Sequence, residues 1–321
     1  DEPEATLSHE KYIKRNEDGT YNITLNASGT IGSKTNPTKL DIVLIVDVSG
    51  SMADDDKLKN TKEAIKALVD VFNSDDKKDL VDVRYKLVTF SKNASIKTKD
   101  WVTGDTLYKS YVKGLKADGG TNYDQGLKRG AEAINSSTRT GAKKVVIFLT
   151  DGEPTYYGEN AKNCGVHTSS KTLSTALNTA TTIKCSDFYA VGIGLSSSIN
   201  VYSEDAVYSN YTGCQGHGWW NSIAQTLSGQ NILDQIKSKV NATNKDAWNL
   251  TDASTLTSKF QEIAGETLTV ACTNVVITDT LSEYVDVTDG SNGSKLSVKI
   301  AEKNADNNTY TDKYSQEFTL T

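Results

Sequence analysis

One apolar run, DIVLIVD at Asp41–Asp47, places five consecutive apolar residues between two aspartates. A continuous run of this kind is typical of a central parallel strand that is covered on both faces. Apolar residues then recur at helical spacing across Lys57–Phe72, and the acidic residues 54–56 precede that helix, where the helix dipole favours negative charge. A buried strand followed directly by an amphipathic helix predicts an α/β fold.

The same alternation of strands and helices continues through the middle of the chain. Repeated units of this kind build a doubly wound, mostly parallel sheet, and such sheets bind ligands beyond the carboxyl ends of their strands. We therefore predict an α/β domain over residues 40–265. Its further elements are strands at Tyr85–Phe90, Lys144–Thr150 and Phe188–Gly194, and helices at Tyr123–Ile134, Ser170–Ile183, within 222–240, and at Asp252–Ala264.

The two ends of the chain alternate with a period of two instead. Tyr12–Ala27 alternates around Asp18-Gly19, a hairpin signal, and Thr269–Thr321 alternates throughout. A lone hairpin is hardly stable in water. We therefore interpret residues 1–39 and 266–321 as two parts of one all-β sandwich interrupted by the α/β domain, with two separate β pieces as the alternative. The alternation still runs at the last residue, so we expect the second part to be truncated.

Bulk composition narrows the classes of function. The chain has 321 residues and a net charge of −6, with no basic stripe of the kind that binds a phosphate backbone, so we expect no nucleic-acid partner. No apolar run approaches the roughly 20 residues that cross a bilayer. We therefore expect two domains and no membrane span in this chain.

Oxygen-bearing side chains gather where the predicted strands end. Because the carboxyl ends of parallel strands share one edge of a sheet, we expect three such segments to meet there. Hydroxyl and carboxylate oxygens select Mg²⁺, with Mn²⁺ or Ca²⁺ as alternatives. A role as helix cap would explain one of the segments but not three. The five residues are Asp47, Ser49 and Ser51 after the first strand, Thr121 in a Gly-Gly-Thr turn, and Asp151 after Lys144–Thr150.

This set resembles the metal-ion-dependent adhesion site (MIDAS) of von Willebrand factor A domains, in which D-x-S-x-S is followed by a Thr and then an Asp. The resemblance covers the predicted α/β domain and implies a Rossmann-like sheet. It also implies that Ser49, Ser51 and Thr121 coordinate the cation directly, whereas Asp47 and Asp151 act largely through water. Neutral hydroxyl ligands leave most of the metal charge uncancelled, so an incoming carboxylate can complete the shell.

Two stretches, 153–169 and 195–251, are longer than the alternation needs. Both leave the carboxyl edge of a strand, so we expect both to rise around the metal as inserted loops. Tyr and Trp are favoured in binding surfaces, although Trp219 and Trp220 could equally form a small core of the second insert. The aromatic residues of the two stretches include Tyr156, Tyr157, Tyr202, Tyr208, Tyr211, Trp219 and Trp220.

Four cysteines are present and none forms a C-x-x-C pair, which argues against zinc and for two disulfides of a secreted protein. Cys164 and Cys214 belong to the two inserted loops, which we expect at the carboxyl edge of the sheet. Cys185 precedes a strand and Cys272 follows the last helix, both at the opposite edge. The topology therefore predicts Cys164–Cys214 and Cys185–Cys272, with four buried thiols as the alternative.

The whole arrangement resembles the tip adhesins of Gram-positive sortase-assembled pili, in which an A domain is inserted into an Ig-like, Cna-type sandwich. Such sandwiches often carry a Lys–Asn isopeptide bond promoted by an acid. Lys11 and Asp279 stand at plausible positions, but we find no convincing Asn before Thr321. The resemblance implies an extracellular virulence protein of the cell wall or pilus. Its partners would be a host or extracellular-matrix protein that supplies an acidic group, and other pilus subunits.

Three functions compete. The first is metal-dependent adhesion, and the second is a structural pilus or cell-wall subunit whose metal only stabilises loops. The third is a Mg²⁺-dependent hydrolase, which the sequence disfavours. It shows no nucleophile–base pair, holds three histidines, and has Ser49 where a phosphatase-like site would want a second acid. We therefore expect no enzymatic activity.

Overall fold

The chain divides into two compact units, Asp1–Thr273 and Asn274–Thr321. The structure is a computed structural model. It describes residues 7–15, 21–29, 37–75, 77–163, 165, 167–203, 205, 207–209, 213–215, 222–269, 295–303 and 310–319.

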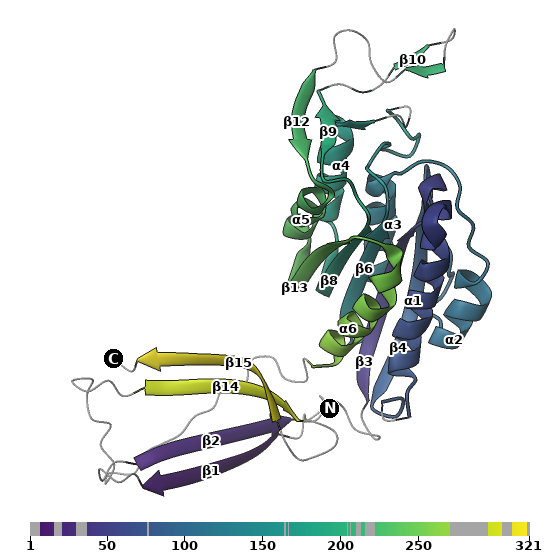
Figure 1. Ribbon diagram of the computed structural model, residues 1–321. Helices are drawn as coiled ribbons and strands as arrows, with labels where there is room; N and C mark the ends of the chain where they lie inside the picture. The colour runs from purple at the N-terminus through teal and green to yellow at the C-terminus, as the bar shows by residue number, and fades with distance from the viewer. Residues whose placement is uncertain are drawn as a thin grey trace. The chain divides into compact units, whose positions relative to one another are not determined.

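A six-stranded sheet forms the centre of the first unit, in the order β13-β8-β6-β3-β4-β5 (Figure 1). All neighbouring pairs are parallel except β4–β5, and β3 lies inside the sheet with Leu44 opposite Leu87 on one side and Ile147 on the other. The predicted mostly parallel α/β sheet is therefore confirmed. The strands are β3 (Thr38–Asp47), β4 (Val81–Phe90), β5 (Ala94–Ile96), β6 (Lys143–Thr150), β8 (Lys184–Ile193) and β13 (Asn241–Leu250).

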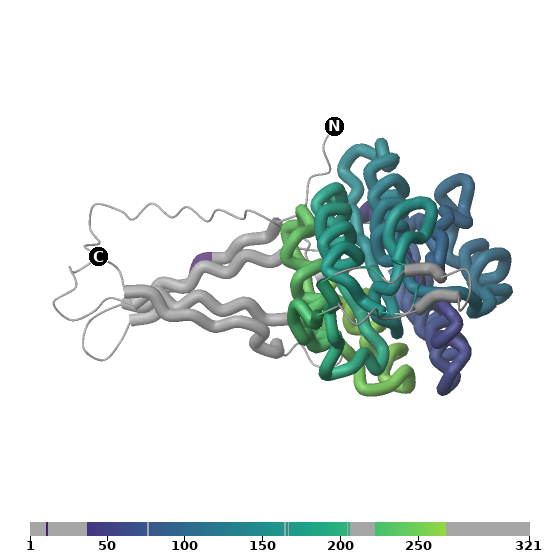
Figure 2. The backbone as a smooth tube through the Cα atoms, turned by 90° about the horizontal axis from the view of Figure 1, so that it is seen from above, coloured from purple at the N-terminus to yellow at the C-terminus, as the bar shows by residue number. Residues whose placement is uncertain are grey.

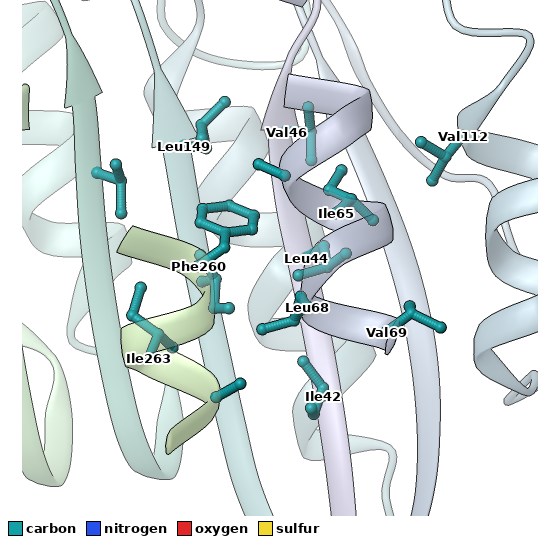
Figure 3. Packing of buried hydrophobic residues seen from close by; sticks show 14 of the residues in the cluster. Ile42, Leu44, Val46, Ile65, Leu68, Val69, Val112, Leu149, Phe260 and Ile263 are labelled. Atoms are coloured by element: carbon teal, nitrogen blue, oxygen red, sulfur yellow. The ribbon is translucent and has the colours of Figure 1, made fainter. Parts of the chain in front are cut away.

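One face of the sheet is covered by α1 (Lys57–Phe72) and α6 (Leu256–Thr269). Alternate residues of β3 point to this face, because successive side chains of a strand lie on opposite sides. Figure 3 shows them packed against both helices, and this core is closed to solvent. Its members include Ile42, Leu44 and Val46 of β3, Ile65, Leu68 and Val69 of α1, and Phe260 and Ile263 of α6.

The opposite face is covered by α3 (Tyr123–Asn135), α4 (Ser170–Ala180) and α5 (Gly229–Lys239), as Figures 1 and 2 show. An aromatic trio stands at its upper end. The rings of Phe90 and Phe148 stack with centroids 5.4 Å apart, and Tyr123 meets Phe148 edge-on at 5.0 Å. The second core therefore joins α3 firmly to two central strands.

A smaller three-stranded sheet, in the order β12-β9-β7, lies beyond the carboxyl ends of the central strands (Figure 1). Both predicted inserts contribute to it, since β7 comes from 153–169 and the other two strands from 195–251. Its strands are β7 (Thr168–Ser169), β9 (Ile199–Tyr202) and β12 (Ile223–Leu227), and a separate hairpin pairs β10 (Val207–Ser209) with β11 (Gly213–Gln215).

The second predicted insert is shorter than expected. Its last part belongs to the α/β domain. Helix α5 packs on the face of the sheet that α3 and α4 also cover, and β13 pairs in parallel with β8 along its whole length. Two further differences lie at the other edge of the sheet. Antiparallel β5 was not predicted, nor was the helical stretch of α2 (Gly104–Thr106) and the π-helical Leu107–Val112.

The terminal segments form antiparallel hairpins. β1 (Leu7–Arg15) pairs with β2 (Tyr21–Gly29), and in the second unit β14 (Lys295–Lys303) pairs with β15 (Tyr310–Thr319). These strands agree with the predicted alternation, whereas Asp18-Gly19 and the alternation between 270 and 294 lie outside the described residues. None of the helices in the described part of the chain has the length and apolarity needed to cross a bilayer.

Candidate metal centre

The first predicted segment is fixed to the third by the carboxylate of Asp47, at the end of β3. Its Oδ1 accepts a hydrogen bond from the backbone N–H of Ser49 at 2.7 Å, and its Oδ2 accepts one from Thr150 Oγ1 at 2.6 Å. The backbone N–H of Gly50 donates to the Gly119 carbonyl at 2.8 Å. The turn after β3 is therefore tied to both of the other loops.

Two hydroxyls and one carboxylate converge above this turn. Ser49 Oγ and Ser51 Oγ are 3.2 Å apart, and Asp151 Oδ1 accepts from Ser51 Oγ at 2.9 Å and from Ser49 Oγ at 3.5 Å. The two serines stand two residues apart in a tight turn, so both hydroxyls reach one point. The Asp151 side chain is 0% exposed. Three oxygen-bearing side chains from two separated loops thus share a small, enclosed space.

Thr121 joins this group from the second loop, just before α3. A Cβ atom placed on Gly152 would lie 2.9 Å from Thr121 Oγ1 and 3.6 Å from Ser51 Oγ, so a side chain at Gly152 would invade the cluster. The Thr121 carbonyl accepts the N–H groups of Thr155 and Tyr156, at 2.9 and 3.0 Å. The structure therefore brings together all five residues that the sequence singled out.

Lys57 is a member of the centre that sequence reasoning missed. As the first residue of α1, it places its Nζ 3.0 Å from Asp151 Oδ2, with 17% of its side chain exposed. Acidic residues are favoured at the start of a helix and basic ones are not. A lysine in the first turn, directly after three aspartates, was therefore the signal that could have revealed it.

The electrostatics of the centre favour an added positive charge. Burial and, to a smaller extent, the charge of Asp151 raise the pKa of Asp47 to about 7, although hydrogen bonds from Thr150 and Ser49 lower it. Burial likewise raises the pKa of Tyr123, whose hydroxyl donates to the Gly152 carbonyl at 2.6 Å. Two enclosed carboxylates repel each other, and a divalent cation between the loops would relieve that repulsion.

The donor set fits a hard divalent cation because it contains only oxygen. Nowhere in the described part of the chain do three or more His, Cys, Asp or Glu side chains gather as they would around zinc. The centre instead combines three neutral hydroxyls with two carboxylates. Hard oxygen ligands of this kind suit Mg²⁺, Mn²⁺ or Ca²⁺.

The acidic residues that flank the centre take structural positions. Asp55 and Asp56 adopt left-handed backbone angles, with φ of 50° and 56°, in the 3₁₀ segment Gly50–Asp56 that leads into α1. The backbone N–H of Asp118 donates to the Val48 carbonyl at 2.8 Å. Burial raises the pKa of Glu153, which accepts a hydrogen bond from Thr168 at 3.5 Å in β7. These groups shape the loops around the centre.

The rim of the centre is built by the first insert. The Tyr156 ring lies directly over Gly120, where a Cβ would come within 2.3 Å of it, and Lys92 Nζ lies 5.4 Å from that ring's centre. Asp205 accepts hydrogen bonds from Tyr157 at 2.7 Å and from Ser169 at 2.5 Å, which ties the two inserts together. Polar contacts thus hold the loops beside the cluster.

Other residues of the inserts and of the chain ends lie away from the centre or outside the described residues. His167 is buried and stacks on Tyr202 with ring centres 4.6 Å apart, in keeping with an ordinary loop residue. Lys11 is exposed on β1. Trp219, Trp220, Tyr211, His217 and Asp279 lie outside the described residues, as do Cys164 and Cys272.

The predicted disulfides stay predictions, since one partner of each pair lies outside the described residues. Cys214 lies in β11, opposite Tyr208. Cys185, at the start of β8, is a free thiol in this structure, and burial together with the charge of Asp187 raises its pKa to about 12. Such a thiol is protonated at neutral pH and is a poor nucleophile.

The fold and the centre together define a von Willebrand factor type A domain. The model of that family matches residues 41–202, half of the chain, so the chain belongs to this family. A second family model, described as a domain of unknown function, matches residues 272–321.

Curated relatives match a little over a third of the chain. The chain is 31% identical over 124 residues to inter-alpha-trypsin inhibitor heavy chain H2 of Sus scrofa, which covers 37% of this chain and 13% of that protein. It is 34% identical over 116 residues to calcium-activated chloride channel regulator 1 of Bos taurus, with 35% and 12% covered. The chain thus spans about an eighth of the length of these relatives.

The fold extends to a larger part of the chain in solved structures. Two crystal structures of the pilus adhesin SpaC from Lactobacillus rhamnosus GG give TM-scores of 0.53 and 0.52 at 18% and 19% identity. Each covers 82% of this chain and 34% of SpaC. At such low identity the likeness concerns the fold alone.

Proposed function

We propose that this chain is a cell-surface or pilus-tip adhesin that captures an acidic group of a host or extracellular-matrix protein through a divalent cation. The observation that carries the proposal is the meeting of three hydroxyls with only two carboxylates at the carboxyl edge of the sheet. Such a donor set holds a hard cation without cancelling its charge. Mg²⁺ is the expected ion, with Mn²⁺ or Ca²⁺ as alternatives.

Each residue of the centre has a distinct role in this proposal. Ser49, Ser51 and Thr121 are the direct ligands. Asp47 and Asp151 stand behind them and act largely through water, because hydrogen bonds from Thr150 and from the serines already engage their oxygens. The cation, when bound, supplies the electrostatic attraction for the carboxylate of a partner. No catalytic role is proposed.

The surroundings of the centre support a protein ligand. The inserts rise beside it, and Tyr156 and Lys92 stand at its rim. An aromatic ring offers large contact area at low entropic cost, and a lysine attracts acidic partners. The fold likeness to SpaC, described as a pilus adhesin, supports an extracellular position on the wall or pilus of a Gram-positive bacterium. Other pilus subunits would then be further partners.

One observation favours a second candidate function, that of a structural pilus or cell-wall subunit with a stabilising metal. Asp47 holds the turn after β3 and the end of β6 through two hydrogen bonds. Loss of its carboxylate would therefore weaken the fold whether or not a partner binds. The test of adhesion needs a variant that spares these bonds, and Thr121→Val does so.

The decisive experiment is a binding screen against matrix proteins in the presence of Mg²⁺ or EDTA, with wild type, Asp47→Ala and Thr121→Val. We expect capture of at least one protein that EDTA and Thr121→Val both abolish. Capture that persists in EDTA for every ligand would overturn the adhesion mechanism. Weaker folding of Asp47→Ala, with no partner bound by wild type, would favour the structural candidate.

We further propose that residues 1–39 and 266–321 form the two parts of one Ig-like, Cna-type sandwich around the α/β domain of 40–265. The antiparallel hairpins on either side of that domain support this division. Expression of residues 37–269 tests it, since an inserted domain has its own core and folds alone. Failure of that fragment to fold would contradict the division.

Covalent cross-links complete the proposal and can be tested by mass. The pairs Cys164–Cys214 and Cys185–Cys272 would appear in peptide maps made without reduction, and a link between Cys164 and Cys185 would refute them. An isopeptide bond at Lys11, promoted by Asp279, would lower the intact mass by one ammonia. An unchanged mass would exclude that bond.

A further inference from the structure

We propose that Lys57 lowers the affinity of the centre for the cation and raises its affinity for an acidic ligand. This inference rests on the proposed function. It is based on the different partners of the two carboxylate oxygens of Asp151. Oδ1 accepts hydrogen bonds from the hydroxyls of Ser49 and Ser51, whereas Oδ2 lies 3.0 Å from the Lys57 ammonium.

The contact is built into the fold rather than reached by a free surface side chain. Asp151 is fully buried at the end of β6, and only 17% of the Lys57 side chain is exposed. Lys57 is the first residue of α1, and Leu58, the next residue, is buried in the core under the sheet. The packing of α1 against the sheet therefore places the backbone of Lys57 within reach of Asp151.

Charge decides the effect. The three hydroxyls carry no charge and the two carboxylates act largely through water, so a bound dication would keep much of its charge, and Lys57 adds one further positive charge beside it. Because Lys57 shares Asp151 with the cation side of the centre, it weakens the hold on the cation and strengthens the hold on an incoming carboxylate. At these short distances and at reduced dielectric, one unit charge shifts each affinity by about tenfold.

A purely structural role for Lys57 predicts a different outcome. If the lysine only holds Asp151 in place, its loss weakens both the cation and the acid. The two roles are distinguished by the direction of the cation effect. Lys59 offers a matched control, because it carries the same charge on the same helix and pairs with exposed Asp56 at 3.6 Å.

The experiment uses the full chain and two probes, Mg²⁺ alone and a short poly-glutamate peptide at saturating Mg²⁺, both followed by calorimetry. For Lys57→Met we expect Mg²⁺ to bind about tenfold more tightly and the peptide about tenfold more weakly. Lys57→Arg should restore both affinities, and Lys59→Met should leave both within about twofold of wild type. Circular dichroism confirms that each variant is folded.

The outcomes separate this inference from the proposed function. Wild type that binds no Mg²⁺ overturns both. Wild type that binds Mg²⁺ while Lys57→Met changes neither affinity, or weakens both, overturns the role of Lys57 alone. An equal change in Lys59→Met would also overturn it, because the effect would then reflect overall charge. If Lys57→Met does not fold, Lys57→Gln, which also removes the charge, takes its place with the same expected and contradicting outcomes.

Discussion

Each half of strand β3 carries a buried aspartate, and the two carboxylates differ in the partners that the fold gives them. At the amino end, Asp41 accepts hydrogen bonds from Arg84 Nε and Nη2, at 2.6 and 2.8 Å, and Arg139 lies 3.5 Å away. At the carboxyl end, Asp47 accepts hydrogen bonds from the backbone N–H of Ser49 and from the Thr150 hydroxyl. The protein supplies the cations for the first carboxylate and none directly for the second.

The pKa values of the two groups follow from this contrast. Burial raises the pKa of Asp41, but the hydrogen bonds and charges of the arginines outweigh it, so the net pKa lies below its ordinary value. For Asp47, burial dominates and the pKa rises to about 7. The fold thus supplies partners of opposite charge to Asp41, and under our proposal a bound cation would supply the positive charge for Asp47.

The strongest test of this contrast removes hydroxyls from one end of the strand. Ser49→Ala combined with Ser51→Ala should lower Mg²⁺ affinity at least 100-fold, about 2.7 kcal/mol, because two direct ligands are lost. Calorimetry with Mg²⁺ measures it. Ser137→Ala is the matched control, since Ser137 donates to Asp41 at the other end. It should reduce stability and leave Mg²⁺ affinity unchanged, and Mg²⁺ binding retained by the double variant would refute the centre.

The next test removes the main ion-pair partner of Asp41, at the amino end of β3. Arg84→Met should lower the free energy of unfolding by about 2 kcal/mol, because it leaves buried Asp41 with only Arg139 and Ser137. The methionine stem keeps part of the packing against Trp101, over which the guanidinium lies at 4.6 Å. Urea titration with and without Mg²⁺ measures the effect. A loss that depends on Mg²⁺ would mean that the two ends are not independent.

A pH series compares both ends in one experiment with EDTA present. The raised pKa of Asp47 means that the folded state binds its proton more tightly, so stability falls as pH rises from about 4 to about 7. The lowered pKa of Asp41 gives stability that is present above its unfolded value and lost as pH falls below it. Saturating Mg²⁺ should remove the decline toward pH 7, which is about 4 kcal/mol for a pKa that rises from about 4 to about 7. A decline of the same size with Mg²⁺ would contradict the assignment.

The smallest expected effect gives a baseline for charge pairs in this domain. Lys66 and Asp70 pair at 2.6 Å on α1, with about half of each side chain exposed. Solvent screens such a pair, so Lys66→Met should change the free energy of unfolding by at most about 0.5 kcal/mol. Urea titration beside Arg84→Met tests this. An equal loss in both variants would mean that burial does not distinguish the pairs.

The elements that the sequence predicted well are those with unambiguous burial. β3 and β6 are apolar runs inside the sheet, and α1 shows one apolar stripe, so periodicity alone identifies them. β13, with the sequence NATNKDAWNL, was missed because it lies at the sheet edge and most of its side chains contact solvent. Backbone pairing with β8 makes it a strand, and side-chain patterning does not record that pairing.

In the metal centre, too, the sequence predicted some residues and missed another. The five predicted residues were found because strand ends share an edge, a consequence of topology that the chain order reveals. Lys57 was missed because its contact with Asp151 depends on the rotation of α1 about its axis. That rotation follows from the packing of Leu58, Ile65 and Leu68 against the sheet. A local sequence pattern shows which face of the helix is apolar, but not the rotation angle that brings one particular side chain to the centre.

The entry and exit of the α/β domain lie at one edge of the sheet, and this determines the direction of any pull between that edge and the opposite one. β3 begins at Thr38, and near the end of α6 the Thr267 carbonyl accepts a hydrogen bond from Lys143, a residue paired with Leu40. A ligand held at the opposite edge would direct tension along β3. The hydrogen bonds that join β3 to β4 and β6 would then be loaded together rather than one after another.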